Sequence, residues 1–79
     1  MTNRFTVQEL LEILGSDEAL FDFLQGRVVC DLVARMQIRV TCRPFRREDG
    51  SLWFGSSHDE HIAIYDDDFV DVNVLELLR

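Results

Sequence analysis

The spacing of apolar residues along the chain changes from a helical period to a strand period near residue 35. In the first segment, apolar side chains recur every three or four residues and share one helical face: Val7, Leu10, Leu11 and Leu14. Thr6 and Glu9 have the spacing of a capping box, which indicates where this helix begins. Gly15 suits the left-handed residue that ends a helix. These signals predict a helix between Thr6 and Gly15.

A second helix is predicted between Ser16 and Gly26. Ser16 can cap its first turn, and Asp17 and Glu18 complement the positive end of the helix dipole. Its inward side chains would be Leu20, Phe23 and Leu24. Residues 27–35 fit a helix or a strand because their valines tolerate both, and we favour a third helix there.

From residue 36 the apolar side chains alternate with polar ones, which predicts a half-buried strand over residues 36–42. Its inward side chains would be Met36, Ile38, Val40 and Cys42. Pro44 disfavours a longer central strand, and the Asp-Gly pair at 49 and 50 is a hairpin signal, so residues 51–54 should return antiparallel. Residues 61–65 predict a third strand. A fourth is marked by Val70, Val72 and Val74.

The predicted fold is therefore α+β: two or three N-terminal helices packed on one face of a small antiparallel sheet of about four strands. A chain of 79 residues is expected to form a single domain over residues 1–79. The helical pair followed by the hairpin resembles the helix-turn-helix and wing of winged-helix or MerR-type regulators, over roughly residues 6–54. This resemblance implies a partly winged-helix-like order, α-α-β-β.

Composition and cysteine usage indicate a globular protein of the cytoplasm, or of the host cytoplasm if a virus encodes it. No apolar run approaches the roughly 18 residues that span a bilayer, and the polar start is not a signal peptide, so no membrane partner is expected. Cys30 and Cys42 are surrounded by apolar residues, where free cysteine behaves as a small buried hydrophobe. No cofactor is predicted.

Charge is distributed unevenly along the chain, whose formal net charge is -7. Residues 1–34 carry two Arg against six acids, residues 35–47 carry five Arg and no acid, and residues 48–79 carry one Arg against nine acids. Two acidic blocks therefore flank one basic insert. Carboxylates on a common surface attract basic partners and speed their capture.

The acidic candidates fall in two groups, one on the second helix and one near the last strand. Carboxylates on the outward face of the second helix would repel phosphates, which argues against a DNA-reading helix. At phosphate-like intervals they can instead compete for a positively charged groove of a protein. The predicted partner-binding residues are Asp17, Glu18, Asp22, Asp66, Asp67, Asp68 and Asp71.

The basic insert supplies the alternative. Three of its arginines are spaced by four residues, which on an outward strand face places them about 13 Å apart in one row. With Trp53 and Phe54 of the returning strand, they could form a phosphate or base-stacking surface. The alternative nucleic-acid-binding residues are Arg35, Arg39, Arg43, Arg46, Arg47 and Trp53. The same row could also pair with acids of neighbouring strands, such as Asp71 or Glu60.

Metal and catalytic motifs are not recognised. Residues 58–61 read HDEH, whose histidines are three apart, whereas the helical zinc-protease motif needs four. Residues 66–68 lack the alternate ligands, Gly and distal Glu of an EF-hand loop. There is no nucleophile elbow and no phosphate-cradling glycine loop. The sequence predicts neither a metal site nor an enzyme.

The leading hypothesis is a non-enzymatic interaction or inhibitor protein. Its acidic surface would dock on a basic surface of a larger protein, one that handles nucleic acid, and Trp53 or an exposed Phe would anchor the contact. In composition the chain resembles phage-encoded inhibitors, including DNA mimics and anti-CRISPR proteins. Two alternatives remain: a winged-helix-like DNA-binding regulator that uses the arginines and the hairpin, and a self-associating structural subunit, such as a homodimer, that pairs edge strands.

Overall fold

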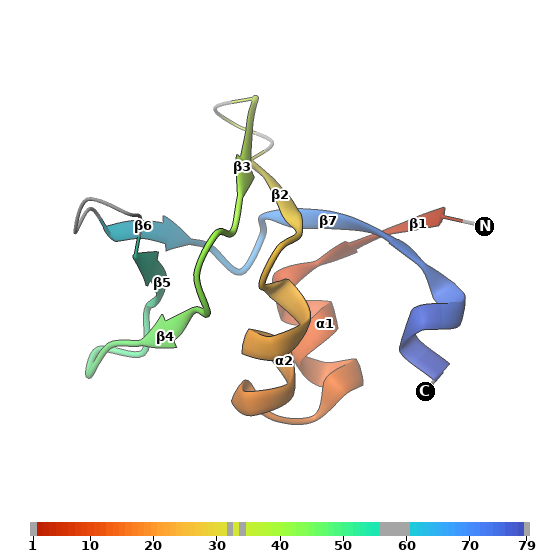
Figure 1. Ribbon diagram of the computed structural model, residues 1–79, viewed down its shortest axis with the longest axis horizontal. Helices are drawn as coiled ribbons and strands as arrows, with labels where there is room; N and C mark the ends of the chain where they lie inside the picture. The colour runs from red at the N-terminus through yellow and green to blue at the C-terminus, as the bar shows by residue number, and fades with distance from the viewer. Residues whose placement is uncertain (1, 32, 34, 56–60, 79) are drawn as a thin grey trace.

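The computed structural model describes residues 2–31, 33, 35–55 and 61–78, which form a mixed α+β structure (Figure 1). The elements, in chain order, are β1 (Thr2–Thr6), α1 (Val7–Leu14), α2 (Asp17–Leu24), β2 (Val28–Asp31), β3 (Met36–Arg39), β4 (Phe45–Arg46), β5 (Leu52–Gly55), β6 (His61–Ile64), β7 (Phe69–Asn73) and the 3-10 helix η1 (Val74–Leu78). Within these described segments, no helix is long and apolar enough to cross a membrane.

Both predicted helices form where their capping residues place them. The Thr6 hydroxyl accepts a hydrogen bond from Glu9 N at 3.1 Å, and the Glu9 carboxylate accepts one from Thr6 N at 3.0 Å. Gly15 ends α1 with a φ of 86°, in the left-handed region that favours glycine. The Ser16 hydroxyl then accepts a hydrogen bond from Ala19 N at 3.2 Å and begins α2. Local capping therefore determines the helical pair.

The predicted element order and single four-stranded meander are wrong. The chain begins with strand β1, so the helices are not its first elements. Strand β1 pairs with β7, and the described strands form two sheets, in the orders β1-β7-β2-β3 and β4-β5-β6. Figure 1 shows both helices on one side of the four-stranded sheet, with the three-stranded sheet beside them. Strand β1 is mostly polar, so its sequence carried no strand signal. It pairs with β7 near the other end of the chain, and a local pattern cannot record that pairing.

The segment between the helices and the hairpin also differs from expectation. The favoured third helix over residues 27–35 is wrong, because Val28–Asp31 forms β2, antiparallel to β3. The strand predicted over 36–42 ends at Arg39, and Cys42 is exposed rather than packed. The hairpin at the Asp-Gly pair does form, but it joins β5 to the short β4.

The two sheets and the helices contribute to one apolar core. Its buried side chains are Val7, Leu10, Leu20, Phe21, Leu24, Val29, Val40, Leu52, Phe54, Ile64, Val70 and Val72. Leu52, Phe54 and Ile64 reach it from the three-stranded sheet, so that sheet keeps only its other face for solvent. The packing of this core therefore fixes which side of the small sheet is outward.

A pair of substitutions on α1 tests this assignment of the core. Leu10 is 0% exposed and Ile13 is 49% exposed. We expect Leu10→Ala to lower the free energy of unfolding by about 2–5 kcal/mol, because it leaves a cavity. Ile13→Ala, the control on the same helix, should change it by less than about 1 kcal/mol. Urea unfolding measures both, and equal losses would contradict the assignment.

Candidate functional site

The structure pairs the predicted acids of α2 with two of the predicted arginines. Arg43 Nη2 lies 2.6 Å from Glu18 Oε2, and Arg43 Nε lies 2.9 Å from Asp22 Oδ1. These hydrogen bonds, first that to Asp22, raise the pKa of Arg43. Arg46 binds both carboxylate oxygens of Asp17, at 2.8 and 3.0 Å. Three carboxylates thus face two guanidinium groups, and the α2 cluster keeps about one negative charge.

The remaining arginines do not continue the expected row. Strand β3 ends at Arg39, whose Nη1 donates to Gly26 O at 2.8 Å. Arg35 lies in the turn before β3, with a φ of 54°. Asp71 was expected to pair with the row, but its Oδ1 lies 3.5 Å from Nε of Arg4 instead. The arginines that were predicted to form one nucleic-acid-binding row are therefore spread over several parts of the surface.

Arg47 and Trp53 are brought together on the outer face of the three-stranded sheet. The Arg47 guanidinium lies 3.8 Å from the centroid of the Trp53 ring, and its Nη2 lies 3.1 Å from Nδ1 of His61. Phe45 and Ala63 are the cross-strand partners of Trp53, so all three share this face. Partly exposed rings here contrast with the buried side chains on the opposite face of the same strands.

The hairpin turn holds the indole in one orientation. Trp53 Nε1 donates to the Ser51 hydroxyl at 2.7 Å, and that hydroxyl donates to the Asp49 carboxylate. Asp49 also accepts a hydrogen bond from Ser51 N at 2.9 Å. The bond from the Ser51 hydroxyl, followed by that from its backbone N–H, lowers the pKa of Asp49. An ionised carboxylate at the turn therefore fixes the ring through one serine.

A small hollow adjoins Trp53 where β6 leaves the sheet. It has a volume of about 170 Å³, and its lining residues are Gly50, Ser51, Leu52, Trp53, Ala63, Ile64, Tyr65 and Asp66. Tyr65 is 59% exposed. The volume is below the roughly 300–1,000 Å³ of small-molecule sites, so the hollow has room for one long side chain rather than for a substrate.

The turn after β6 determines which of the predicted acids near the last strand are exposed to solvent. Asp68 is 6% exposed, and its carboxylate accepts a hydrogen bond from Tyr65 N at 2.9 Å. Burial raises the pKa of Asp68, and the nearby charges of Asp31 and Asp67 raise it further, against the effect of the Tyr65 N–H. Asp66 and Asp67 are exposed and make no hydrogen bond or ion pair through their side chains with any described residue.

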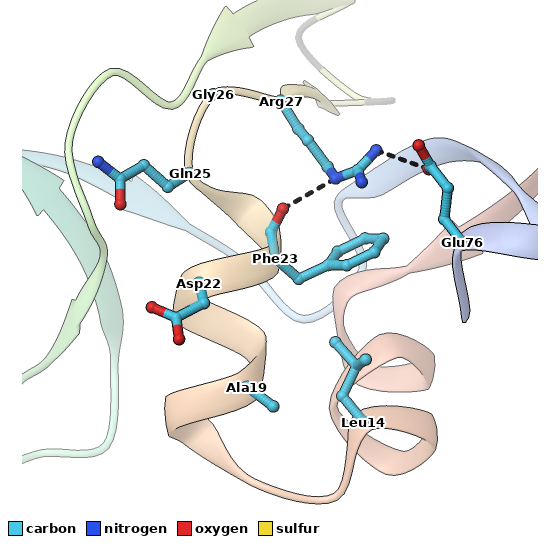
Figure 2. A pocket seen from close by; sticks show the side chains of 8 residues that line it. All are labelled: Leu14, Ala19, Asp22, Phe23, Gln25, Gly26, Arg27 and Glu76. Atoms are coloured by element: carbon cyan, nitrogen blue, oxygen red, sulfur yellow. Dashed lines mark hydrogen bonds and ion pairs between the residues drawn. The ribbon is translucent and has the colours of Figure 1, made fainter. Parts of the chain in front are cut away.

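A larger hollow lies elsewhere, between the two helices and η1, and has a volume of about 630 Å³ (Figure 2). Arg27 stacks on Phe23 at 3.9 Å from the ring centroid and donates from Nε to Phe23 O at 2.8 Å. Its Nη1 lies 3.0 Å from Glu76 Oε2. These contacts attach η1 to the end of α2, so the polar groups that converge in this hollow already bind one another.

We name the outward side of the three-stranded sheet, with Phe45, Trp53 and Tyr65, the aromatic face. Comparison of the chain with protein-family models, curated proteins and solved structures finds no match.

The sequence indicated Trp53 but missed Phe45 and Tyr65. The signal for Tyr65 was the alternation in residues 61–65, which places Ala63 and Tyr65 on one face, but only the β5–β6 pairing brings that face beside Trp53.

Two substitutions of Asp68 test its role in the turn. Because the folded state raises the pKa of this carboxyl, its ionisation costs stability as the pH rises from the unfolded value of about 4 through the folded value. Asp68→Asn keeps an acceptor for Tyr65 N and does not ionise. Relative to the native chain, we expect this variant to become more stable as the pH rises from about 3 to about 7.

Asp68→Ala is the comparison, because it removes the acceptor. It should be less stable than Asp68→Asn by about 1–3 kcal/mol. Thermal unfolding measured across the pH range checks both expectations. A difference between Asp68→Asn and the native chain that does not change with pH would show that Asp68 does not titrate as described.

Proposed function

We propose that this chain is a non-enzymatic interaction protein whose aromatic face, flanked by carboxylates, docks on a basic surface of a larger protein that handles nucleic acid. The observation that carries the proposal is the grouping of Trp53, exposed Tyr65 and Asp66 in one hollow on this face. Trp, Tyr and Arg are the residue types most enriched among those that dominate binding energy at protein interfaces.

Charge supports a basic partner. The side chains of Asp66 and Asp67 remain unpaired among the described residues, next to the first turn of α1, where Gln8 N donates to Asp66 O at 3.1 Å. Glu9 and Glu12 on that helix are exposed as well. Carboxylates beside partly buried rings attract a cationic surface over a distance of about a Debye length and orient its approach.

The proposed action is inhibition by occupation. A protein groove that binds nucleic acid carries Lys and Arg, and carboxylates compete with phosphates for those side chains. The proposed action resembles that of phage-type inhibitors and DNA mimics, such as anti-CRISPR proteins. The DNA-binding alternative has less support, because Arg43 and Arg46 are engaged by acids of α2.

Matched neutralisations test the acidic contact. Asp66→Asn with Asp67→Asn and Glu18→Gln with Asp22→Asn each change the net charge by two units. We expect the first pair to weaken capture of the partner roughly three- to tenfold, and the second pair to weaken it less, because Arg43 already neutralises much of that cluster.

Capture from native lysate is measured at about 0.05 M and about 0.3 M salt, with the bound protein identified and then purified for titration. The loss caused by the first pair should shrink at the higher salt. Equal losses from the two pairs would mean that only total charge matters, and no loss from either would remove the acidic contact.

A second candidate is self-association through the β2–β3 hairpin, which projects away from the helices in Figure 1. β3 is an edge strand whose first residue, Met36, is 55% exposed, and Val33, which precedes the strand, is 89% exposed. An open edge with apolar side chains can pair with a second copy. We expect a dimer mass by light scattering that Met36→Asp abolishes; a strict monomer at high concentration would exclude this candidate.

A further inference from the structure

The hollow on the aromatic face has the chemistry of a site for one cationic side chain. Two aromatic residues, Trp53 and Tyr65, line it together with the carboxylate-bearing Asp66. Aromatic rings attract cations through their electron-rich faces, most strongly for Trp. A carboxylate on the rim adds a charged partner. From this arrangement we infer that the hollow receives a single arginine side chain of the basic partner, an inference that rests on the proposed function.

Arg47 provides an internal example of the same contact. Its guanidinium lies 3.8 Å from the Trp53 ring centroid, and it is not among the residues that line the hollow. Trp53 therefore already accepts a guanidinium within the molecule. A cation from outside the chain would instead meet Trp53 from the hollow, beside Tyr65 and Asp66.

The Trp53 indole and the Tyr65 backbone are held in place before any partner arrives. The Asp49–Ser51 turn fixes the Trp53 indole through its N–H, and buried Asp68 fixes the backbone of Tyr65. A site whose side chains are already ordered loses less conformational entropy on binding than a mobile one.

Arginine fits better than lysine. A guanidinium is planar, stacks on an aromatic ring and is more weakly hydrated than an ammonium group, so it costs less to desolvate. It also offers several N–H donors in one plane, which can reach the Asp66 carboxylate while the plane lies on a ring. The compact ammonium of lysine cannot make both contacts through one flat surface.

The sole tryptophan of the chain gives the readout, because a cation placed on the indole changes its fluorescence. The probes are blocked pentapeptides with four glycines around a central arginine, lysine or citrulline, the last being a neutral analogue of arginine. We expect the arginine peptide to change Trp53 fluorescence saturably. The lysine peptide should bind roughly two- to fivefold more weakly, and the citrulline peptide should give no saturable change.

Asp66→Asn and Asp67→Asn are a matched pair, since each removes one charge and only Asp66 lines the hollow. Asp66→Asn should weaken the arginine peptide roughly two- to fivefold, and Asp67→Asn by less than about twofold. Tyr65→Ala should weaken it roughly two- to fivefold, whereas Tyr65→Phe, which keeps the ring, should retain binding. All four changes are at exposed positions.

Three results would overturn the inference: equal binding of the citrulline and arginine peptides, equal losses from Asp66→Asn and Asp67→Asn, or fluorescence that responds to a thymidine oligonucleotide and not to arginine. The partner capture described above separates this inference from the proposed function. If capture needs Asp66 and Asp67 while Tyr65→Ala leaves it unchanged, the acidic contact stands and the arginine site is wrong. If the arginine peptide binds but neutralising those acids leaves capture unchanged, the reverse holds.

Discussion

The turn between β6 and β7 is the connection on which the rest of the structure depends. Here the chain leaves the three-stranded sheet and enters the four-stranded one. The buried Asp68 carboxylate accepts Tyr65 N, while Asp68 O accepts Val7 N at 2.8 Å and Asp66 O accepts Gln8 N at 3.1 Å. The first N–H groups of a helix have no partner within the helix, so this turn supplies acceptors that α1 needs. One short segment thus joins both sheets to the helical pair and places Tyr65 and Asp66 beside Trp53.

Internal neutralisation changes the meaning of the charge map. The segment counts suggested an acidic surface on α2 and a separate basic insert, but the fold brings Arg43 and Arg46 against Asp17, Glu18 and Asp22. Exposed ion pairs of this kind contribute little to stability, about 0–1 kcal/mol each. Their larger effect is on recognition, because they remove most of the field that α2 would otherwise project. The acids left for a partner are those that the fold does not pair.

The helices could be predicted because their signals are local. Thr6, Glu9, Gly15 and Ser16 act within one helical turn, and the structure uses each of them as the sequence indicated. Strand β7 was also found, since its alternation is contained within five residues. The β4–β5 hairpin followed from its turn residues, although the strand before the turn proved much shorter than expected.

Strand pairing over long separations could not be predicted in this way. The polar residues of β1 become a strand because β7 offers them backbone partners, which no local pattern records. Residues 27–35 carried valines that suit a helix or a strand, and pairing of β2 with β3 and β7 decided between them. The same limit applied to the site: Trp53 was identified by its type, whereas Tyr65 needed the β5–β6 pairing to become its neighbour.

The packing of the core does not by itself account for the exposed ring of Tyr65. Burying an aromatic side chain stabilises a small protein substantially, so a chain of 79 residues gains little by leaving Tyr65 mostly in solvent. Hydrogen bonds at both neighbouring turns hold the Trp53 indole and the Tyr65 backbone, and Arg47 stacks on the indole. Orientation without burial contributes little to folding, but it lowers the entropic cost of contact with another molecule. The proposed docking site on this face rests on that combination of an exposed Tyr65 with a held Trp53 indole.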